Sequence, residues 1–195
     1  MKSDIKKAYL LSDESSSELT VNRISEDDLI INVPLAAPDT MNTVVVLDIN
    51  EPVEIDSVRL LAGKFDNTLL AFDSELHGDG FTYGDGKVNR EYTAGWKSKE
   101  QWISWKFRLN ESEKYEILLS YVTASETDSG SIVCEIDGKQ YPVEYTAPQE
   151  NAGNAKINIG SLELSKGEHT IKLLMNTHSG DECMRPLYVT MSLEK

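Results

Sequence analysis

The chain has 195 residues, of which 39% are hydrophobic and 27% charged, enough to bury one full core and part of a second. Its formal net charge of −14 repels phosphate backbones and anionic lipid headgroups, so neither nucleic acid nor a membrane surface is expected as a partner. No apolar run approaches the roughly 20 residues that span a bilayer, and the first residues do not read as a signal peptide. The sequence alone therefore leaves the cellular location open.

The first 53 residues contain short runs rich in β-branched residues, separated by polar segments with the composition of turns. They predict a small antiparallel sheet of four strands with an apolar face around Val44 and Val46. Because four strands bury too little surface to stand alone, we expect this segment to dock on the second domain or on another copy of the chain. The predicted strands cover 6–11, 19–24, 29–35 and 43–49.

A second and longer series of strand signals fills residues 54–195, with no helical period sustained over three turns. Asp137-Gly138 lies between two of these runs and favours a two-residue hairpin. Many strands at near-regular spacing indicate an all-β fold, an antiparallel β-sandwich. The predicted strands cover 69–72, 81–84, 102–109, 115–122, 131–136, 139–145, 155–164, 169–175 and 187–194.

The period-two alternation of the predicted strands also predicts which residues form the core of the sandwich. Apolar residues that alternate with polar ones within one strand share a face, and that face is the one that packs against the second sheet. The residues expected to be buried together are Ile103, Trp105, Phe107, Ile132, Cys134, Ile136, Ile171, Leu173, Met175, Leu187, Val189, Met191 and Leu193.

All three tryptophans of the chain lie within the stretch GWKSKEQWISWKF. Trp105 has the parity of the apolar positions of its strand, whereas Ser104 and Lys106 have the polar parity, so Trp105 is expected in the core. Trp102 has the polar parity, and Trp96 precedes the strand in a loop. For these two, covering the edge of the core and contacting a ligand both remain open.

An aromatic platform with a few fixed polar groups suits a sugar, whose C–H face stacks on a ring while its hydroxyls form hydrogen bonds. We expect Trp96 to line a loop depression for a neutral sugar, with Trp102 at its base. The alternative for Arg185 is a surface guanidinium that pairs with neighbouring acidic residues. The other loop residues with suitable chemistry are Asn89, Tyr92 and Arg185.

Other chemistry has little support in the sequence. The three histidines share no metal-binding spacing, and no glycine-rich loop precedes a helix that could hold phosphate. Cys134 lies on an apolar strand face and is expected to be buried and inert, whereas Cys183 lies in a loop with no evident base beside it. No catalytic residue and no cofactor is assigned.

Several motifs resemble those of a known group of proteins. SELHG (74–78) followed by GWKSKEQWISWKF (95–107) resembles the opening of galactose-binding-like jelly-roll modules appended to bacterial glycoside hydrolases, including α-L-fucosidases. GEHTIKLLM (167–175) and LYVTMSLEK (187–195) fit the last hairpin of such a module. The segment 5–49 is similar to the closing strands of the β-sandwich that follows the catalytic barrel in retaining α-L-fucosidases.

The resemblance implies a C-terminal portion of such an enzyme, in which residues 1–53 end one β-sandwich and residues 54–195 form a carbohydrate-binding module. The family's catalytic carboxylates would lie upstream, and the parent family suggests a periplasmic or secreted location. Related modules hold a structural calcium, for which Glu75 matches one ligand. Leu187-Tyr188 stands where the second, acidic ligand is expected, so the resemblance gives calcium only partial support.

Three functions follow from these observations. The first is a non-catalytic carbohydrate-binding accessory region of an α-L-fucosidase-like hydrolase, with a neutral oligosaccharide or glycan as partner. The second is a purely architectural β-sandwich that braces a catalytic barrel or a partner subunit without a ligand. The third, with the least support, is a small free-standing glycoside hydrolase, because 33 acidic residues leave a catalytic pair of carboxylates open.

Overall fold

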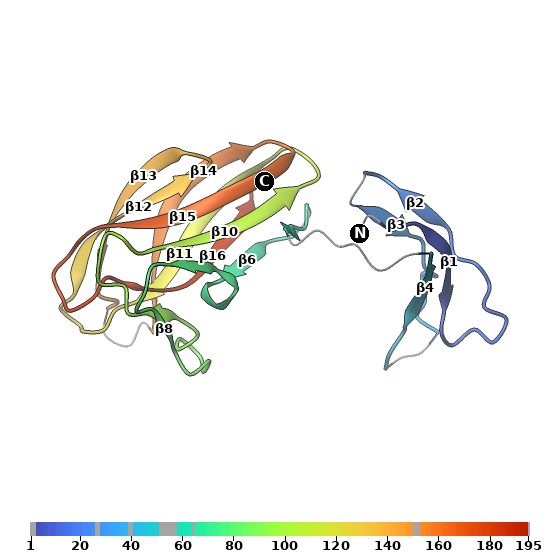
Figure 1. Cartoon of the computed structure of the whole chain (residues 1–195), viewed down its shortest axis with the longest axis horizontal. Helices are drawn as coiled ribbons and strands as arrows, with labels where there is room; N and C mark the ends of the chain where they lie inside the picture. Colours follow the sequence, from blue (N-terminus) through green and yellow to red (C-terminus); the bar gives the residue numbers. More distant parts are fainter. Residues whose placement is uncertain are drawn as a thin grey trace. The chain divides into compact units, whose positions relative to one another are not determined.

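The protein is an all-β chain that divides into two compact units, residues 1–57 and 58–195 (Figure 1). Apart from strands, the described segments contain one 3-10 turn, η1 (Ala71–Asp73). The all-β prediction is thus confirmed, whereas the predicted boundary between residues 53 and 54 lies outside the described residues. The computed structural model describes residues 3–25, 28–38, 41–50, 58–63, 65–149 and 153–194.

The first unit contains the four predicted antiparallel strands, arranged as two separate two-stranded sheets. One sheet pairs β1 (Ile5–Leu10) with β4 (Val45–Ile49), and the other pairs β2 (Val21–Arg23) with β3 (Leu29–Ile31). Val46 is half-buried within β4, but Val44 precedes the strand and is exposed, so the predicted apolar face does not include it.

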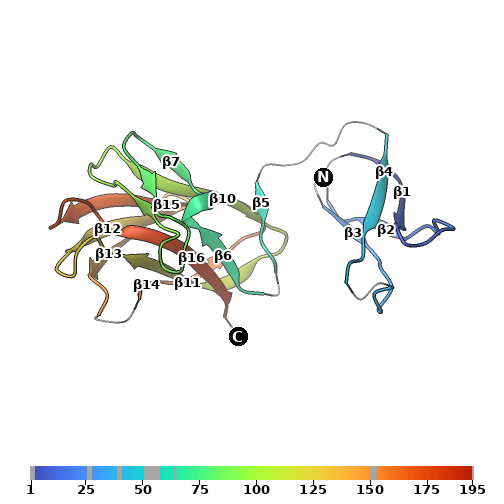
Figure 2. The ribbon, with the colours of Figure 1, turned by 90° about the horizontal axis from the view of Figure 1, so that it is seen from below.

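The second unit is a sandwich of two sheets, drawn in Figure 1 and seen from below in Figure 2. In the six-stranded sheet, all pairings are antiparallel except the short parallel pairing of β5 with β10. Its order is β13 (Lys139–Thr146), β12 (Ser129–Ile136), β15 (Gly167–His178), β10 (Trp102–Leu109), and then β5 (Arg59–Leu60) and β7 (Glu75–His77), which both pair with β10.

The second sheet of the sandwich has four antiparallel strands, and a small hairpin lies beside the two sheets. The hairpin consists of β8 (Thr82–Tyr83) and β9 (Thr93–Ala94) and holds the loop between them. The four-stranded sheet has the order β14 (Ala155–Leu164), β11 (Glu113–Val122), β16 (Arg185–Leu193) and β6 (Asn67–Leu70).

The core forms between the two sheets, where the predicted alternation places it. Every predicted core residue is buried except Leu193, which is half-buried near the end of β16. Trp105 is buried as predicted, and its indole Nε1 donates a hydrogen bond to the backbone oxygen of Leu70 at 2.7 Å. Ser104 is also buried, although its parity is polar, because β7 pairs beside it and His77 Nε2 lies 2.9 Å from its hydroxyl.

The predicted hairpin at Asp137-Gly138 joins β12 to β13. Both residues have positive φ, 49° and 82°, which is the geometry of a type I′ turn. The Asp137 carboxylate also accepts a hydrogen bond from the Thr170 backbone nitrogen at 2.9 Å and lies 2.6 Å from Nδ1 of the buried His169. These contacts fix the hairpin to the neighbouring strand β15.

Candidate functional site

Trp96 is a core residue, so the expectation of an exposed indole in a loop is wrong. Its side chain is 0% exposed, and its Nε1 donates a hydrogen bond to the backbone oxygen of Gln101 at 2.9 Å. The loop closes over the ring because the Gln101 side chain accepts hydrogen bonds from the backbone nitrogens of Lys97 and Ser98. A buried indole has no free face for a sugar, so Trp96 is not part of the candidate site.

Trp102 lies on the solvent face of the six-stranded sheet, half-buried. Its ring stacks on His77 of the adjacent strand β7, with the ring centroids 4.5 Å apart and the planes 7° from parallel. The positions that the sequence predicts to be polar thus face solvent, and the imidazole of His77 covers one side of the Trp102 indole. This contact places Trp102 in the sheet surface.

Tyr92 and Arg185, two of the predicted site residues, lie together. The Arg185 guanidinium is 5.0 Å from the centroid of the Tyr92 ring, and its Nη1 is 3.5 Å from the tyrosine hydroxyl. Glu182 holds the arginine through a hydrogen bond of 2.7 Å from Nε and also accepts one from the Gly95 backbone nitrogen. Arg185 therefore braces the loops with its acidic neighbour while its side chain stays 25% exposed.

Asn89, the remaining predicted residue, connects two loops. It adopts a left-handed conformation with φ of 58°, which asparagine tolerates better than most residues. Its side-chain oxygen accepts a hydrogen bond from Asn154 at 3.0 Å. The loop between β8 and β9 is thereby tied to the segment that leads into β14.

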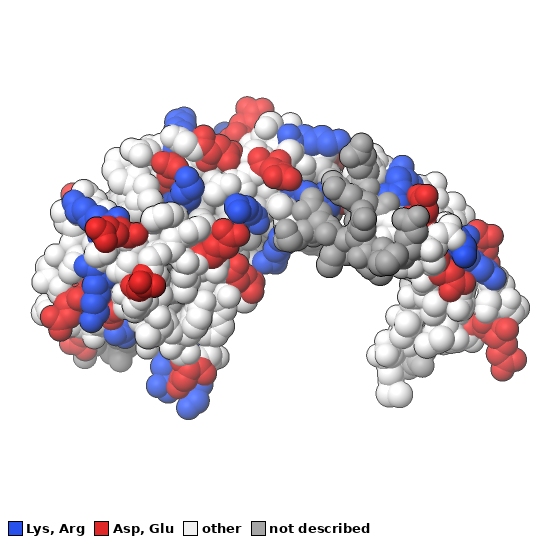
Figure 3. All heavy atoms as spheres, viewed as in Figure 1, with Lys and Arg blue, Asp and Glu red and all other residues white. Residues whose placement is uncertain are grey.

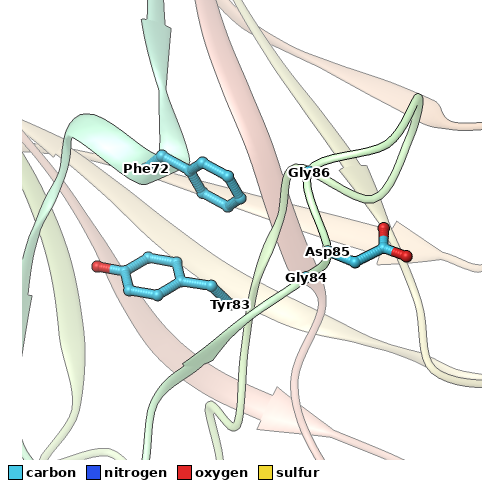
Figure 4. Close-up of a pocket in the computed structure, with 5 residues that line it drawn as sticks. All are labelled: Phe72, Tyr83, Gly84, Asp85 and Gly86. Carbon is cyan, nitrogen blue, oxygen red and sulfur yellow. The ribbon is translucent and has the colours of Figure 1, made fainter.

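A pocket of about 390 Å³ opens beside this loop and is lined by Phe72, Tyr83 and residues 84–86 (Figure 4). Phe72 comes from η1 and Tyr83 from β8, and the two rings meet edge to face with centroids 5.2 Å apart. Both side chains remain open to solvent, at 40% and 54% exposure. Two aromatic rings that a folded protein leaves exposed in a hollow form a surface suited to a flat, partly apolar ligand.

The loop that lines this pocket depends on a glycine for its shape. A side chain on Gly84 would meet the Arg90 backbone oxygen at 1.9 Å, so the tight return of the loop requires glycine there. The same position faces the Tyr92 ring at 3.1 Å, which places the Tyr92–Arg185 pair directly behind the pocket wall. Asp85 points away from the two rings in Figure 4 and pairs with Arg90 at 3.2 Å.

Phe72 and Tyr83 were not singled out from the sequence, because both fall in short apolar runs that indicate strands. The signal that would have found Tyr83 is its position inside GDGFTYGDG, where glycines on both sides leave an aromatic ring uncovered. On the face of the molecule shown in Figure 3, Lys and Arg side chains are interspersed with Asp and Glu side chains.

Neither cysteine is poised for chemistry. Cys134 is buried as predicted, and burial raises the pKa of its thiol to about 12. Cys183 lies in the loop before β16, as predicted, but it is buried as well, and burial raises the pKa of its thiol to about 11. A thiol held protonated in this way is a poor nucleophile at neutral pH.

The residues present do not fit the calcium site that the sequence resemblance implies. Glu75 lies on the solvent face of the six-stranded sheet and pairs with Lys106 at 3.4 Å, whereas Leu187 is fully buried. Among the described residues, no group of three or more His, Cys, Asp or Glu side chains is placed to hold a metal ion. Within the same residues, no helix is long and apolar enough to cross a membrane.

Comparison with known proteins places the fold. No family model matches the chain, and no curated protein matches it. The chain is similar in structure to the Podospora anserina GH26-CBM35 β-(1,4)-mannanase, with 17% identity and a TM-score of 0.55, over 68% of this chain and 28% of the mannanase. It therefore spans less than a third of that enzyme.

Two isolated modules are also similar. A family 35 carbohydrate-binding module from Clostridium thermocellum matches with 12% identity and a TM-score of 0.52, over 65% of this chain and 96% of the module. The CBM36-1 domain of a multidomain xylanase from the hindgut metagenome of Trinervitermes trinervoides matches with the same identity, TM-score and coverage. At these identities the likeness concerns the fold, which is the antiparallel β-sandwich of jelly-roll type predicted from the sequence.

Proposed function

We propose that this chain is a non-catalytic carbohydrate-binding module that holds a neutral sugar in the pocket lined by Phe72 and Tyr83. The observation that supports it best is the pair of exposed aromatic rings in a pocket of about 390 Å³. A sugar ring would pack its C–H face on these side chains, with hydroxyls directed to the loop backbone. Tyr92 and Arg185 would support the pocket from behind, and Asn89 would fix the position of its loop.

The similarity to modules attached to hydrolases extends the proposal to the larger protein. One similar structure is a GH26-CBM35 mannanase, and another is a domain of a multidomain xylanase. We propose that this chain accompanies an α-L-fucosidase-like hydrolase, with a catalytic barrel upstream and residues 1–53 as the closing strands of its β-sandwich. The motifs at 5–49 and 74–107 support this context, and a periplasmic or secreted location agrees with it.

The proposed pocket is tested by replacing one aromatic side chain. Tyr83→Ala should weaken binding to the best ligand from a glycan array by roughly 1 kcal/mol or more, on the scale of aromatic contacts. Its unfolding temperature should stay close to that of the parent chain, because Tyr83 is more than half exposed. Isothermal titration calorimetry with mannan, xylan and galactan oligosaccharides measures the first quantity, and calorimetric unfolding the second.

Phe65 and Phe72 provide a matched pair of exposed phenylalanines near the two ends of β6. Phe72→Ala should weaken binding as Tyr83→Ala does, whereas Phe65→Ala should leave it unchanged. If both phenylalanine variants bind like the parent chain, the pocket is not the sugar site. If no glycan binds the parent chain at millimolar concentration, the architectural β-sandwich that braces a barrel or a partner subunit is the better explanation.

A further inference from the structure

The solvent face of the six-stranded sheet has a row of aromatic and aliphatic side chains that crosses five strands. Residues paired across neighbouring strands point to the same face, and the residues next to these, such as Ile103 and Leu173, point into the core. The row is therefore on the outer face throughout. In strand order from β7 to β13 it consists of His77, Trp102, Leu174, Val133 and Pro142.

The aromatic end of this row is held in a fixed position. Trp102 stacks on His77 with a centroid distance of 4.5 Å, and His77 Nε2 lies 2.9 Å from the hydroxyl of the buried Ser104. Leu174 and Val133 continue the row at half-buried positions, and Pro142 ends it on the exposed edge strand. A surface fixed in this way loses little conformational entropy when a ligand covers it.

Polar side chains border the row on one side, and their charges cancel. Lys172 pairs with Glu135 at 3.0 Å, and Lys106 pairs with Glu75 at 3.4 Å. The hydrogen bond from Lys172 lowers the pKa of Glu135, so this carboxylate stays ionised at neutral pH. The border therefore presents two positive and two negative groups that are already paired.

The other border consists of neutral hydrogen-bonding groups and one exposed carboxylate, that of Glu144, which lies opposite Ser131 in the ladder. Asn176 donates from Nδ2 to the Ser131 hydroxyl at 2.9 Å, and Ser131 lies 2.8 Å from the hydroxyl of Thr177. The row is thus an apolar strip between two polar strips, one with paired charges and one of amide, hydroxyl and carboxylate groups that can bond to sugar hydroxyls. A sugar chain has the complementary profile, with C–H faces along its middle and hydroxyls along both edges.

We propose that this row is a second ligand surface, which binds a neutral linear polysaccharide chain lying across the strands. Four strand spacings of about 4.8 Å give it a length of roughly 19 Å, which suits a chain segment better than a single sugar. A protein partner is less suited, because protein interfaces depend on aromatic or arginine anchors that insert into a partner, and the indole of the row already stacks on His77. The proposal shares the ligand class of the proposed function, on which it rests, but uses a different face of the sandwich.

The tryptophans give a direct readout of this surface. Trp96 and Trp105 are buried, so a collisional quencher such as acrylamide acts on the native chain mainly through Trp102. Soluble mannan, xylan and galactan are the probes, each with its disaccharide. The polymer that binds should reduce quenching of the native fluorescence, whereas its disaccharide, held in the Phe72–Tyr83 pocket, should leave quenching unchanged. A polymer that binds without shielding Trp102 would overturn the proposal.

Two leucines on the outer faces of different sheets supply the matched variants. Leu174 belongs to the row, and Leu118 has an equivalent half-buried position in β11 of the four-stranded sheet. Leu174→Glu should weaken polymer binding about tenfold or more, because a carboxylate would lose water under the sugar chain, and Leu118→Glu should not. Near-UV circular dichroism verifies that both fold, and Val133→Thr, a milder change, should weaken binding in the same direction.

The same measurements separate the two sites. Tyr83→Ala should no longer bind the disaccharide, but the polymer should still shield its Trp102 from the quencher. Leu174→Glu should still bind the disaccharide, but the polymer should no longer shield its Trp102. Equal polymer binding by folded Leu174→Glu, folded Val133→Thr and the parent chain would exclude the row as a ligand surface and leave the pocket proposal intact. If both variants still bind the disaccharide as the parent chain does, the pocket is excluded as the sugar site, and the proposal for the row is unaffected.

Discussion

Trp96 shows how a single side chain can be needed for stability although it comes from a loop. The indole is fully buried, its nitrogen is hydrogen-bonded, and its backbone oxygen accepts a hydrogen bond from the Cys183 nitrogen at 2.7 Å. Trp96→Ala should therefore lower the free energy of unfolding by about 3–5 kcal/mol, as expected when a large core side chain leaves a cavity. Urea titration followed by circular dichroism measures this change.

Two other variants frame the Trp96 measurement. Trp105→Ala removes a buried indole from the middle of β10 and should cost a similar amount, whereas Phe65→Ala removes an exposed ring and should cost little. A loss below about 1 kcal/mol for Trp96→Ala would mean that the loop opens freely and that the indole is not part of the core.

The three tryptophans also show what alternation can and cannot predict at this scale. Trp105 was predicted correctly because its neighbours in the strand alternate and the period fixes its face. Trp96 was not, because its burial depends on Gln101 closing the loop and on contacts with Glu182 and Cys183, far away in the chain. Such contacts exist only after folding and leave no period in the sequence.

Among the elements, the hairpin between β12 and β13 depends on a backbone conformation that glycine adopts easily. Gly138 has φ of 82°, and a side chain there would meet nothing within 4 Å, so conformation rather than space requires glycine. Gly138→Ala should destabilise the protein by about 1–2 kcal/mol, the cost of a left-handed residue with a Cβ. Thermal unfolding followed by circular dichroism measures this cost.

Gly63 is the control for the hairpin glycine. It too has open space around the position of a Cβ, and its φ lies outside the left-handed range that hinders other residues. Gly63→Ala should therefore leave the unfolding temperature unchanged or raise it slightly, through the smaller entropy of the unfolded chain. Equal losses in both variants would contradict the conformational explanation.

The long strands were predicted well, whereas three of the short ones, β5, β7 and β9, were not. The strands β10 to β16 are eight to twelve residues long, enough for alternation to be visible in the sequence. β5, β7 and β9 have only two or three residues and are strands because β10 or β8 offers hydrogen-bonding partners. Their existence depends on partners distant in sequence, and β7 is the strand that places His77 beside Trp102.

At the scale of the whole molecule, the two units differ in how much they bury. The second unit has a core in which more than a dozen large side chains from both sheets lie between the layers. In the first unit, the buried apolar residues among those described are Ala8 and Leu10, while many larger ones are exposed. The exposed ones include Leu11, Ile24, Ile30, Val33, Leu35, Met41 and Val44. This imbalance supports the proposal that the first unit docks on a partner surface.

The difference in burial predicts a difference in local stability that hydrogen exchange can measure on the intact chain. Two-stranded sheets with little buried surface open easily, so amides of β1 and β4 should exchange about a hundredfold or more faster than those of β10 and β15. A matched comparison uses residues that pair across strands in each unit. These are Ala8 and Leu47 of β1 and β4 in the first unit, and Trp105 and Ile171 of β10 and β15 in the second. Equal protection of both units would mean that they unfold together, and the first unit would then need no further partner. Faster exchange of β1 and β4 that slows when a catalytic barrel or a second copy is supplied would identify the surface on which the first unit docks.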